Sequence, residues 1–191
     1  MDDEELRDLV DRARDTFGTK CPKFTGAITV EIIKRALENH GIRTSARDVF
    51  IKGLPIEIDL LVPRKEANPK DGLLYQPQDV LVVLEIKSSG SFGQKTIDSV
   101  KRSFRRAQQL NESIYCAYVT LAERQQFNWA VSEENTGFPA YTLFWHDGSR
   151  KKYTPSGDWN RLLAKVTDIV QRDSSAATPA LLGRNGTARQ A

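Results

Sequence analysis

Two segments of the chain place carboxylates and a lysine where strands are expected to end. The segment DVLVVLEIKSSG, residues 79–90, holds an unbroken apolar run, Val80–Leu84, followed by Glu85 and Lys87. Such a run is typical of a strand buried on both faces, where two charges are costly unless a function uses them. Asp59 lies upstream, in a stretch whose apolar residues alternate, Ile56–Val62. These charged residues are therefore the first candidates for chemistry.

The residue types suit metal-assisted hydrolysis of a phosphodiester. Residues two apart on a strand share a face, so Glu85 and Lys87 project together and Ile86 projects to the other side. If the two strands pair, Asp59 joins them. Two carboxylates supply the hard oxygen ligands that Mg²⁺ prefers beside water and phosphate, and Mg²⁺ acidifies bound water. A neighbouring lysine stabilises charge that develops in the transition state.

A second interpretation needs no chemistry. Glu-x-Lys is a common tripeptide, and Glu85 and Lys87 could be solvated residues at the end of a strand, with Asp59 merely ending its own run. The context favours a site: the apolar run predicts a central strand, Asp59 lies in a second strand, and a helix follows a turn of small residues.

The elements that would position these residues follow from apolar periodicity. Helical spacing predicts helices over 3–17, 25–40, 94–110, 123–133 and 159–172. Alternating or continuous apolar runs predict strands over 49–51, 56–62, 80–87, 114–121 and 140–145. A run of strands followed by alternating helices and strands predicts an α/β fold with a central mixed β-sheet flanked by helices.

Composition is ordinary for a globular chain of 191 residues, with 39% hydrophobic and 28% charged residues. We expect an N-terminal amphipathic helix in residues 1–20, an α/β domain in 21–172 and a disordered tail in 173–191. Residues 2–15 carry a net charge of −4, so the remainder carries +7, a basic excess compatible with a polyanion. Cys21 and Cys116 lack metal-ligand spacing, and neither a signal peptide nor a membrane span is visible; we therefore expect a reducing, cytoplasmic location.

The residues Asp59 in EIDLL and Glu85-Ile86-Lys87 in VVLEIKSSG, with the order of elements over residues 25–121, resemble the PD-(D/E)xK nuclease superfamily. That resemblance implies a restriction-endonuclease-like core and a DNA-cleaving activity dependent on Mg²⁺, with Mn²⁺ as a substitute. It also implies that Asp59 and Glu85 bind the metal and that Lys87 assists catalysis. Restriction and junction-resolving relatives are often dimers, which leaves a homodimer open.

Many members of that superfamily place a further glutamate on the helix before the first core strand. Glu31, in ITVEIIKRAL, lies on such a helix and is a candidate third metal ligand. A boundary residue that reaches solvent explains Glu31 equally well. Glu57, on the same strand face as Asp59, is a weaker candidate.

The expected helix after Lys87 is strongly basic. Four of its five basic residues form two stripes, each of two residues four apart, a pattern that suits contacts with DNA phosphates, although charged helix faces are often merely solvated. The basic residues are Lys95, Lys101, Arg102, Arg105 and Arg106. The sequence thus favours a Mg²⁺-dependent deoxyribonuclease. The alternative is a non-catalytic domain of the same fold that binds nucleic acid or a protein partner.

Overall fold

The computed structural model of the chain describes residues 3–17, 22–88, 93–124, 133–146 and 153–177. The helices are α1 (Asp3–Phe17), α2 (Pro22–Asn39), α3 (Gln94–Leu110), α4 (Glu133–Thr136) and α5 (Asp158–Ala177), with a short 3₁₀ helix, η1 (Pro77–Asp79). The strands are β1 (Ser45–Ile51), β2 (Ile58–Pro63), β3 (Leu74–Tyr75), β4 (Val80–Lys87), β5 (Tyr115–Arg124), β6 (Ala140–His146) and β7 (Tyr153–Pro155).

The described strands form one mixed sheet in the order β3-β1-β2-β4-β5-β6-β7. β4 lies at its centre, antiparallel to β2 and parallel to β5. Its residues Val80–Leu84 are buried, as the continuous apolar run predicted for a strand covered on both faces. The expected α/β fold with a central mixed sheet is therefore confirmed.

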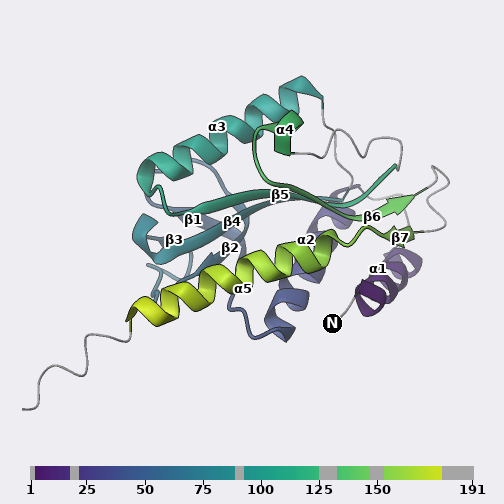
Figure 1. Cartoon of the computed structure of the whole chain (residues 1–191), viewed down its shortest axis with the longest axis horizontal. Helices are drawn as coiled ribbons and strands as arrows, with labels where there is room; N and C mark the ends of the chain where they lie inside the picture. Colours follow the sequence, from purple (N-terminus) through teal and green to yellow (C-terminus); the bar gives the residue numbers. More distant parts are fainter. Residues whose placement is uncertain (1–2, 18–21, 89–92, 125–132, 147–152, 178–191) are drawn as a thin grey trace, which may run out of the picture.

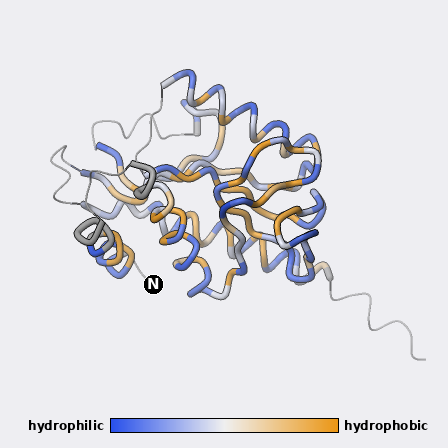
Figure 2. Tube along the Cα trace, turned by 180° about the vertical axis from the view of Figure 1, so that it is seen from behind, coloured by the Kyte–Doolittle hydropathy of each residue, from blue (hydrophilic) through white to orange (hydrophobic). Residues whose placement is uncertain are grey.

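Helices cover both faces of the sheet (Figure 1). α1, α2 and α5 lie on one face, where Ile33, Leu84 and Trp159 belong to one hydrophobic cluster. α3 lies on the other face, where Phe104 packs in a second cluster with Val83. Figure 2 shows the hydrophobic segments gathered on the strands and on the inward sides of the helices. The alternating side chains of β4 thus enter two separate cores, and its charged end is held between them.

Several element boundaries differ from the sequence expectation. α2 begins at Pro22 instead of Thr25, because proline is well suited to a first helical turn. Glu123 and Arg124, expected to start a helix, continue β5 because they pair with Trp145 and His146 of β6. Residues 125–132, the rest of that expected helix up to α4, lie outside the described residues.

The short strands β3 and β7 were not expected, because two or three residues carry no periodic signal. α5 continues to Ala177, so residues 173–177 of the expected tail are helical, and residues 178–191 lie outside the described residues. None of the helices in the described ranges combines the length and the apolar character needed to cross a membrane.

Candidate active site at the end of β4

Asp59 lies directly beside the charged end of β4. The antiparallel register pairs Leu60 with Leu84, and the regular ladder stops there, so Asp59 stands opposite Glu85. Beyond that point the Asp59 carboxylate takes over the role of the backbone acceptor, because its Oδ2 accepts a hydrogen bond from the Ile86 backbone N–H at 2.8 Å. The side chain that is a candidate metal ligand therefore also closes the strand pair.

Lys87 connects the two carboxylates. Its Nζ lies 2.6 Å from Glu85 Oε1 and 3.2 Å from Asp59 Oδ2. The three side chains keep 30% (Glu85), 31% (Asp59) and 42% (Lys87) of their surface exposed, so a ligand from solvent can reach them. The structure thus brings together the three residues that the sequence analysis proposed as catalytic.

The charges perturb one another. Burial raises the pKa of Glu85 and the Asp59 carboxylate raises it further, since two nearby negative charges repel, while Lys87 lowers it. Burial lowers the pKa of Lys87, but attraction to Glu85 and Asp59 outweighs burial and leaves the pKa of Lys87 above its ordinary value. Lys87 therefore stays protonated, whereas Glu85 ionises less readily than a solvated glutamate.

Tyr118 of β5 is a neighbour that the sequence analysis did not single out. It pairs with Glu85 across the parallel strands, and its side chain is buried against Phe138. Burial raises the pKa of Tyr118 to about 12, so the phenol stays neutral beside the charged group. An aromatic residue in an apolar strand carries no sequence signal that separates such a position from ordinary core.

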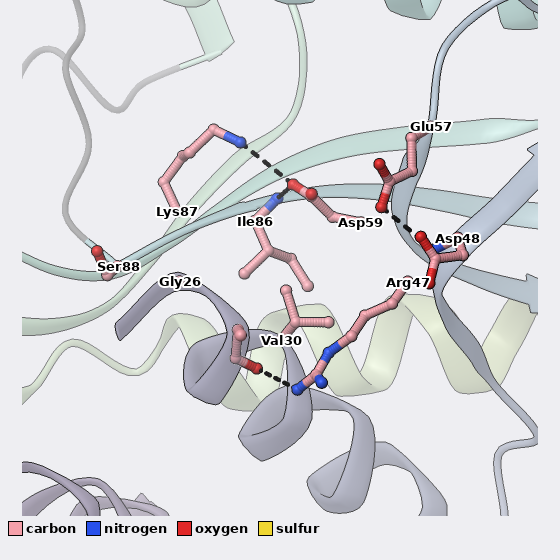
Figure 3. Close-up of a pocket in the computed structure, with 10 residues that line it drawn as sticks. Gly26, Val30, Arg47, Asp48, Glu57, Asp59, Ile86, Lys87 and Ser88 are labelled. Atoms are coloured by element: carbon pink, nitrogen blue, oxygen red, sulfur yellow. Dashed lines mark hydrogen bonds and ion pairs between the residues drawn. The ribbon is translucent and has the colours of Figure 1, made fainter. Parts of the chain in front are cut away.

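A cleft of about 440 Å³ opens beside Asp59 and Lys87. Figure 3 shows the Asp59 carboxylate turned toward Lys87 Nζ, with Ile86 pointing away toward Val30 of α2. The other lining residues come from the N-terminal part of α2, from β1 and from the residues just before β2 and just after β4; they are Gly26, Ala27, Arg47, Asp48, Glu57 and Ser88. Of the candidate residues on β2 and β4, Glu85 alone does not line the cleft. Its carboxylate forms an ion pair with Lys87, which does.

A β-bulge in β1 forms the far wall of the cleft. Ala46 pairs with Leu60 and Val49 with Ile58, so Arg47 and Asp48 together stand opposite Asp59. Both have left-handed backbones, with φ of 61° and 49°. Such a conformation costs about 1–3 kcal/mol for each non-glycine residue and persists only where its surroundings impose it. The sequence analysis missed this feature, because a bulge depends on strand register.

Two contacts hold the bulge in place. The Asp48 backbone N–H donates to Glu57 Oε1 at 3.1 Å, and the Arg47 guanidinium donates to the Ala27 carbonyl of α2 at 2.8 Å (Figure 3). Glu57, the weaker sequence candidate, therefore lines the cleft and supports the bulge.

Glu31 lies on α2, as expected, but outside the cleft lining. Its carboxylate accepts a hydrogen bond from Arg35 Nε at 2.8 Å, and Lys34 Nζ lies 3.9 Å away. The hydrogen bond from Arg35 lowers the pKa of Glu31, while burial opposes it. Its role as a third metal ligand stays a prediction.

The five basic residues lie on α3, whose opposite side is buried through Ile97, Val100, Phe104 and Ala107. Four are exposed: Lys95, Arg102, Arg105 and Arg106. Lys101 is half-buried and its Cε and Nζ pack closely against Gly137, which has a left-handed backbone with φ of 68°. None of the five lines the cleft, so DNA contacts by this helix stay a prediction.

The oxygen donors of the site are compatible with a divalent cation that takes only one or two of its ligands from the protein. Within the described residues, no group of three or more His, Cys, Asp or Glu side chains is placed to hold a metal ion. Asp59 and Glu85 supply two carboxylates from adjacent strands, and Mg²⁺ is usually bound through one or two carboxylates with water and phosphate completing the shell.

The sheet and its two helical layers define a restriction-endonuclease-like fold. The sequence matches no protein-family model and no curated protein. Among solved structures, the chain is similar to the cAAA-bound forms of NucC from E. coli MS115-1 and P. aeruginosa ATCC27853. The first has 14% identity and a TM-score of 0.59, covering 89% of this chain and 93% of that one. The second has 12% identity and a TM-score of 0.60, covering 91% and 95%.

The apo form of E. coli MS115-1 NucC is also similar, with 14% identity, a TM-score of 0.52, and coverage of 88% of this chain and 97% of that one. NucC is a nuclease of the PD-(D/E)xK type. The resemblance drawn from Asp59, Glu85 and Lys87 is therefore confirmed at the level of the fold.

The pKa shifts predict a pH dependence of stability. Because the pKa of Glu85 is higher in the folded chain, the fold keeps a proton that the unfolded chain has lost, and stability falls as pH rises from about 4.3 through the raised value. Glu85→Gln removes this titration. Its free energy of unfolding relative to wild type should therefore increase across that window and level off above it, measured by urea denaturation with EDTA.

Glu31→Gln is the matched control with the opposite sign. The lowered pKa of Glu31 stabilises the fold at pH values above the ordinary glutamate pKa, and this stabilisation is lost as pH falls. The free energy of unfolding of Glu31→Gln, relative to wild type, should therefore decrease as pH rises. If the relative free energy of unfolding of Glu85→Gln also decreased as pH rises, attraction to Lys87 would outweigh burial and the Asp59 charge.

Proposed function

We propose that this chain is a metal-dependent deoxyribonuclease that hydrolyses DNA phosphodiester bonds, with Mg²⁺ as the metal and Mn²⁺ as a substitute. The observation that carries the proposal is the convergence of Asp59, Glu85 and Lys87 at one end of the sheet. The similarity to NucC nucleases supports a nuclease function, since it is the fold of those enzymes that this chain shares.

In this proposal Asp59 and Glu85 hold the cation, and Glu31 is a candidate for a further ligand. A divalent cation bound there would acidify a water molecule and neutralise charge on the phosphate. The Ile86 N–H holds the Asp59 carboxylate in position, so the side chain loses little conformational entropy when it binds the cation. Lys87, protonated and partly exposed, stabilises the charge that accumulates on the phosphate oxygens as the bond breaks.

One observation favours a second candidate, a domain of the same fold that binds nucleic acid without cleaving it. Lys87 forms ion pairs with both carboxylates, so their negative charge is already partly neutralised without a metal ion. A binding domain would need only the basic residues of α3 and tolerate loss of Asp59. The two candidates therefore differ in the response to a single substitution.

Cleavage tests the first candidate directly. The purified chain should cut single-stranded, double-stranded or branched DNA when Mg²⁺ or Mn²⁺ is added, and EDTA should abolish the cutting. Asp59→Asn and Lys87→Ala should each lower the rate by about 100-fold or more, since one removes a metal ligand and the other an electrostatic stabiliser. Rates are measured by gel electrophoresis of labelled DNA.

Glu112→Gln and Lys52→Ala serve as controls. Both side chains are exposed, and Glu112 precedes the start of β5, which pairs with Val82 at the other end of β4 from the site. The controls should cut at the wild-type rate. Metal-dependent cutting that survives in both Asp59→Asn and Lys87→Ala would contradict the proposed active site, and no cutting of any DNA would leave the binding domain as the better account.

DNA contact by α3 predicts a salt effect. Arg102→Ala and Arg106→Ala each remove one exposed cation. The negative slope of log K against log salt should become shallower by about 0.9 for each lost duplex phosphate contact. Binding is measured by fluorescence anisotropy with EDTA present. Arg172→Ala, an exposed arginine of α5 on the opposite face of the sheet, is the control. An equal change in slope for Arg172→Ala would show general charge screening instead of a specific α3 surface.

Two expectations from the sequence stay predictions. The homodimer that the family resemblance leaves open and the cytoplasmic location both await experiment.

A further inference from the structure

The β1 bulge sets a cation across the cleft from Lys87. Arg47 and Asp48 stand opposite Asp59 on one side, while Glu85 stands opposite it on the other. β-bulges are common next to active sites, where they redirect a side chain. Here the bulge sends the Arg47 side chain across the cleft to α2, where the guanidinium donates to the Ala27 carbonyl (Figure 3).

The Arg47 backbone is unfavourable for its residue type. A left-handed φ of 61° suits glycine, and arginine adopts it only where contacts compel it. The chain nevertheless has an arginine here, and the two contacts at Glu57 and Ala27 maintain the strain. Strained residues of this kind cluster at active sites and ligand-binding positions.

The guanidinium is suited to a phosphate. Arg47 is exposed and lines the same cleft as Asp59 and Lys87. Of its five N–H donors, the bond to Ala27 uses one, within the part of the chain that the structure describes. A planar guanidinium fits the oxygens of a phosphate better than a lysine does, and its anchored end reduces the entropy lost on binding.

We infer that Arg47 binds a phosphate of the DNA strand next to the one that lies at Asp59 and Lys87, and so positions the strand in the cleft. This inference rests on the proposed function for the identity of the ligand. Arg47 and Lys87 are the two cations among the described residues that line the cleft. The carboxylates of Asp48 and Glu57 border the same cleft and would repel a phosphate. The DNA strand should therefore enter and leave the cleft at Arg47 and Lys87.

Arg47→Gly and Asp48→Gly make a matched pair, because each replaces a left-handed residue by glycine and relieves the same backbone strain. Both variants should fold, with melting temperatures at or above that of wild type because the strain is relieved. In anisotropy titrations with EDTA, Arg47→Gly should bind duplex DNA roughly tenfold more weakly and reduce the salt slope by about 0.9. Asp48→Gly should bind at least as tightly as wild type.

A neutral phosphate locates the contact. Methylphosphonate linkages placed one at a time along the duplex should weaken wild-type binding where the replaced phosphate is contacted, and the linkage at the Arg47 contact should have no further effect in Arg47→Gly, because both changes remove the same contact. Additive effects at every linkage would overturn the inference, as would equal binding by Arg47→Gly and Asp48→Gly.

These binding measurements are independent of cleavage. If the wild type cuts DNA but Arg47→Gly binds normally, the inference fails and the proposed function stands. If no metal supports cutting while Arg47→Gly still loses binding, the proposed catalysis fails and the role of Arg47 stands. A wild type that neither binds DNA nor cuts it with any metal would overturn both.

Discussion

The bond from the Ile86 N–H to the Asp59 carboxylate is the interaction on which the site depends. It occurs where the β2–β4 ladder ends, so a side chain replaces the next backbone acceptor and keeps the two strands together. That bond, together with the contact from Lys87, fixes the Asp59 carboxylate relative to Glu85 and Lys87. The same carboxylate therefore links the packing of the central sheet to the arrangement of the charges.

Burial of the strands makes this arrangement rigid. Val80–Leu84 packs into hydrophobic clusters on both faces of the sheet, and β5 continues the sheet beside the charged end through pairs such as Glu85 with Tyr118. The charged residues follow directly on this buried run. Site residues held on strands are positioned more accurately than residues on loops, which suits chemistry that depends on the separation of two carboxylates.

Electrostatic balance explains why cations lie among the carboxylates of this site. Asp59 and Glu85 carry two negative charges and Lys87 one positive charge, so the group favours a further cation. A DNA backbone, by contrast, is repelled by those carboxylates. Lys87 and Arg47 in the cleft, with the exposed cations of α3 beyond it, supply the opposite charge that a phosphate requires.

Sequence patterns predicted the centre of this site better than its edges. The bounds of β4 and α3 followed from an unbroken apolar run and a regular helical stripe, and residues two apart on β4 share a face by geometry alone. The bulge at Arg47 and Asp48 depends on pairing with β2, and the strand conformation of Glu123 depends on pairing with β6. Such features are decided by contacts between distant segments, which local periodicity does not encode.

A crystal structure grown with Mn²⁺ tests the central claim most directly. The account predicts an anomalous scattering peak about 2.0–2.6 Å from a carboxylate oxygen of both Asp59 and Glu85, the usual range for oxygen ligands of hard cations. Its absence in crystals of Asp59→Asn grown under the same conditions would assign the peak to this pair. A fully formed Asp59–Lys87–Glu85 bridge with no Mn²⁺ at either carboxylate would contradict the account.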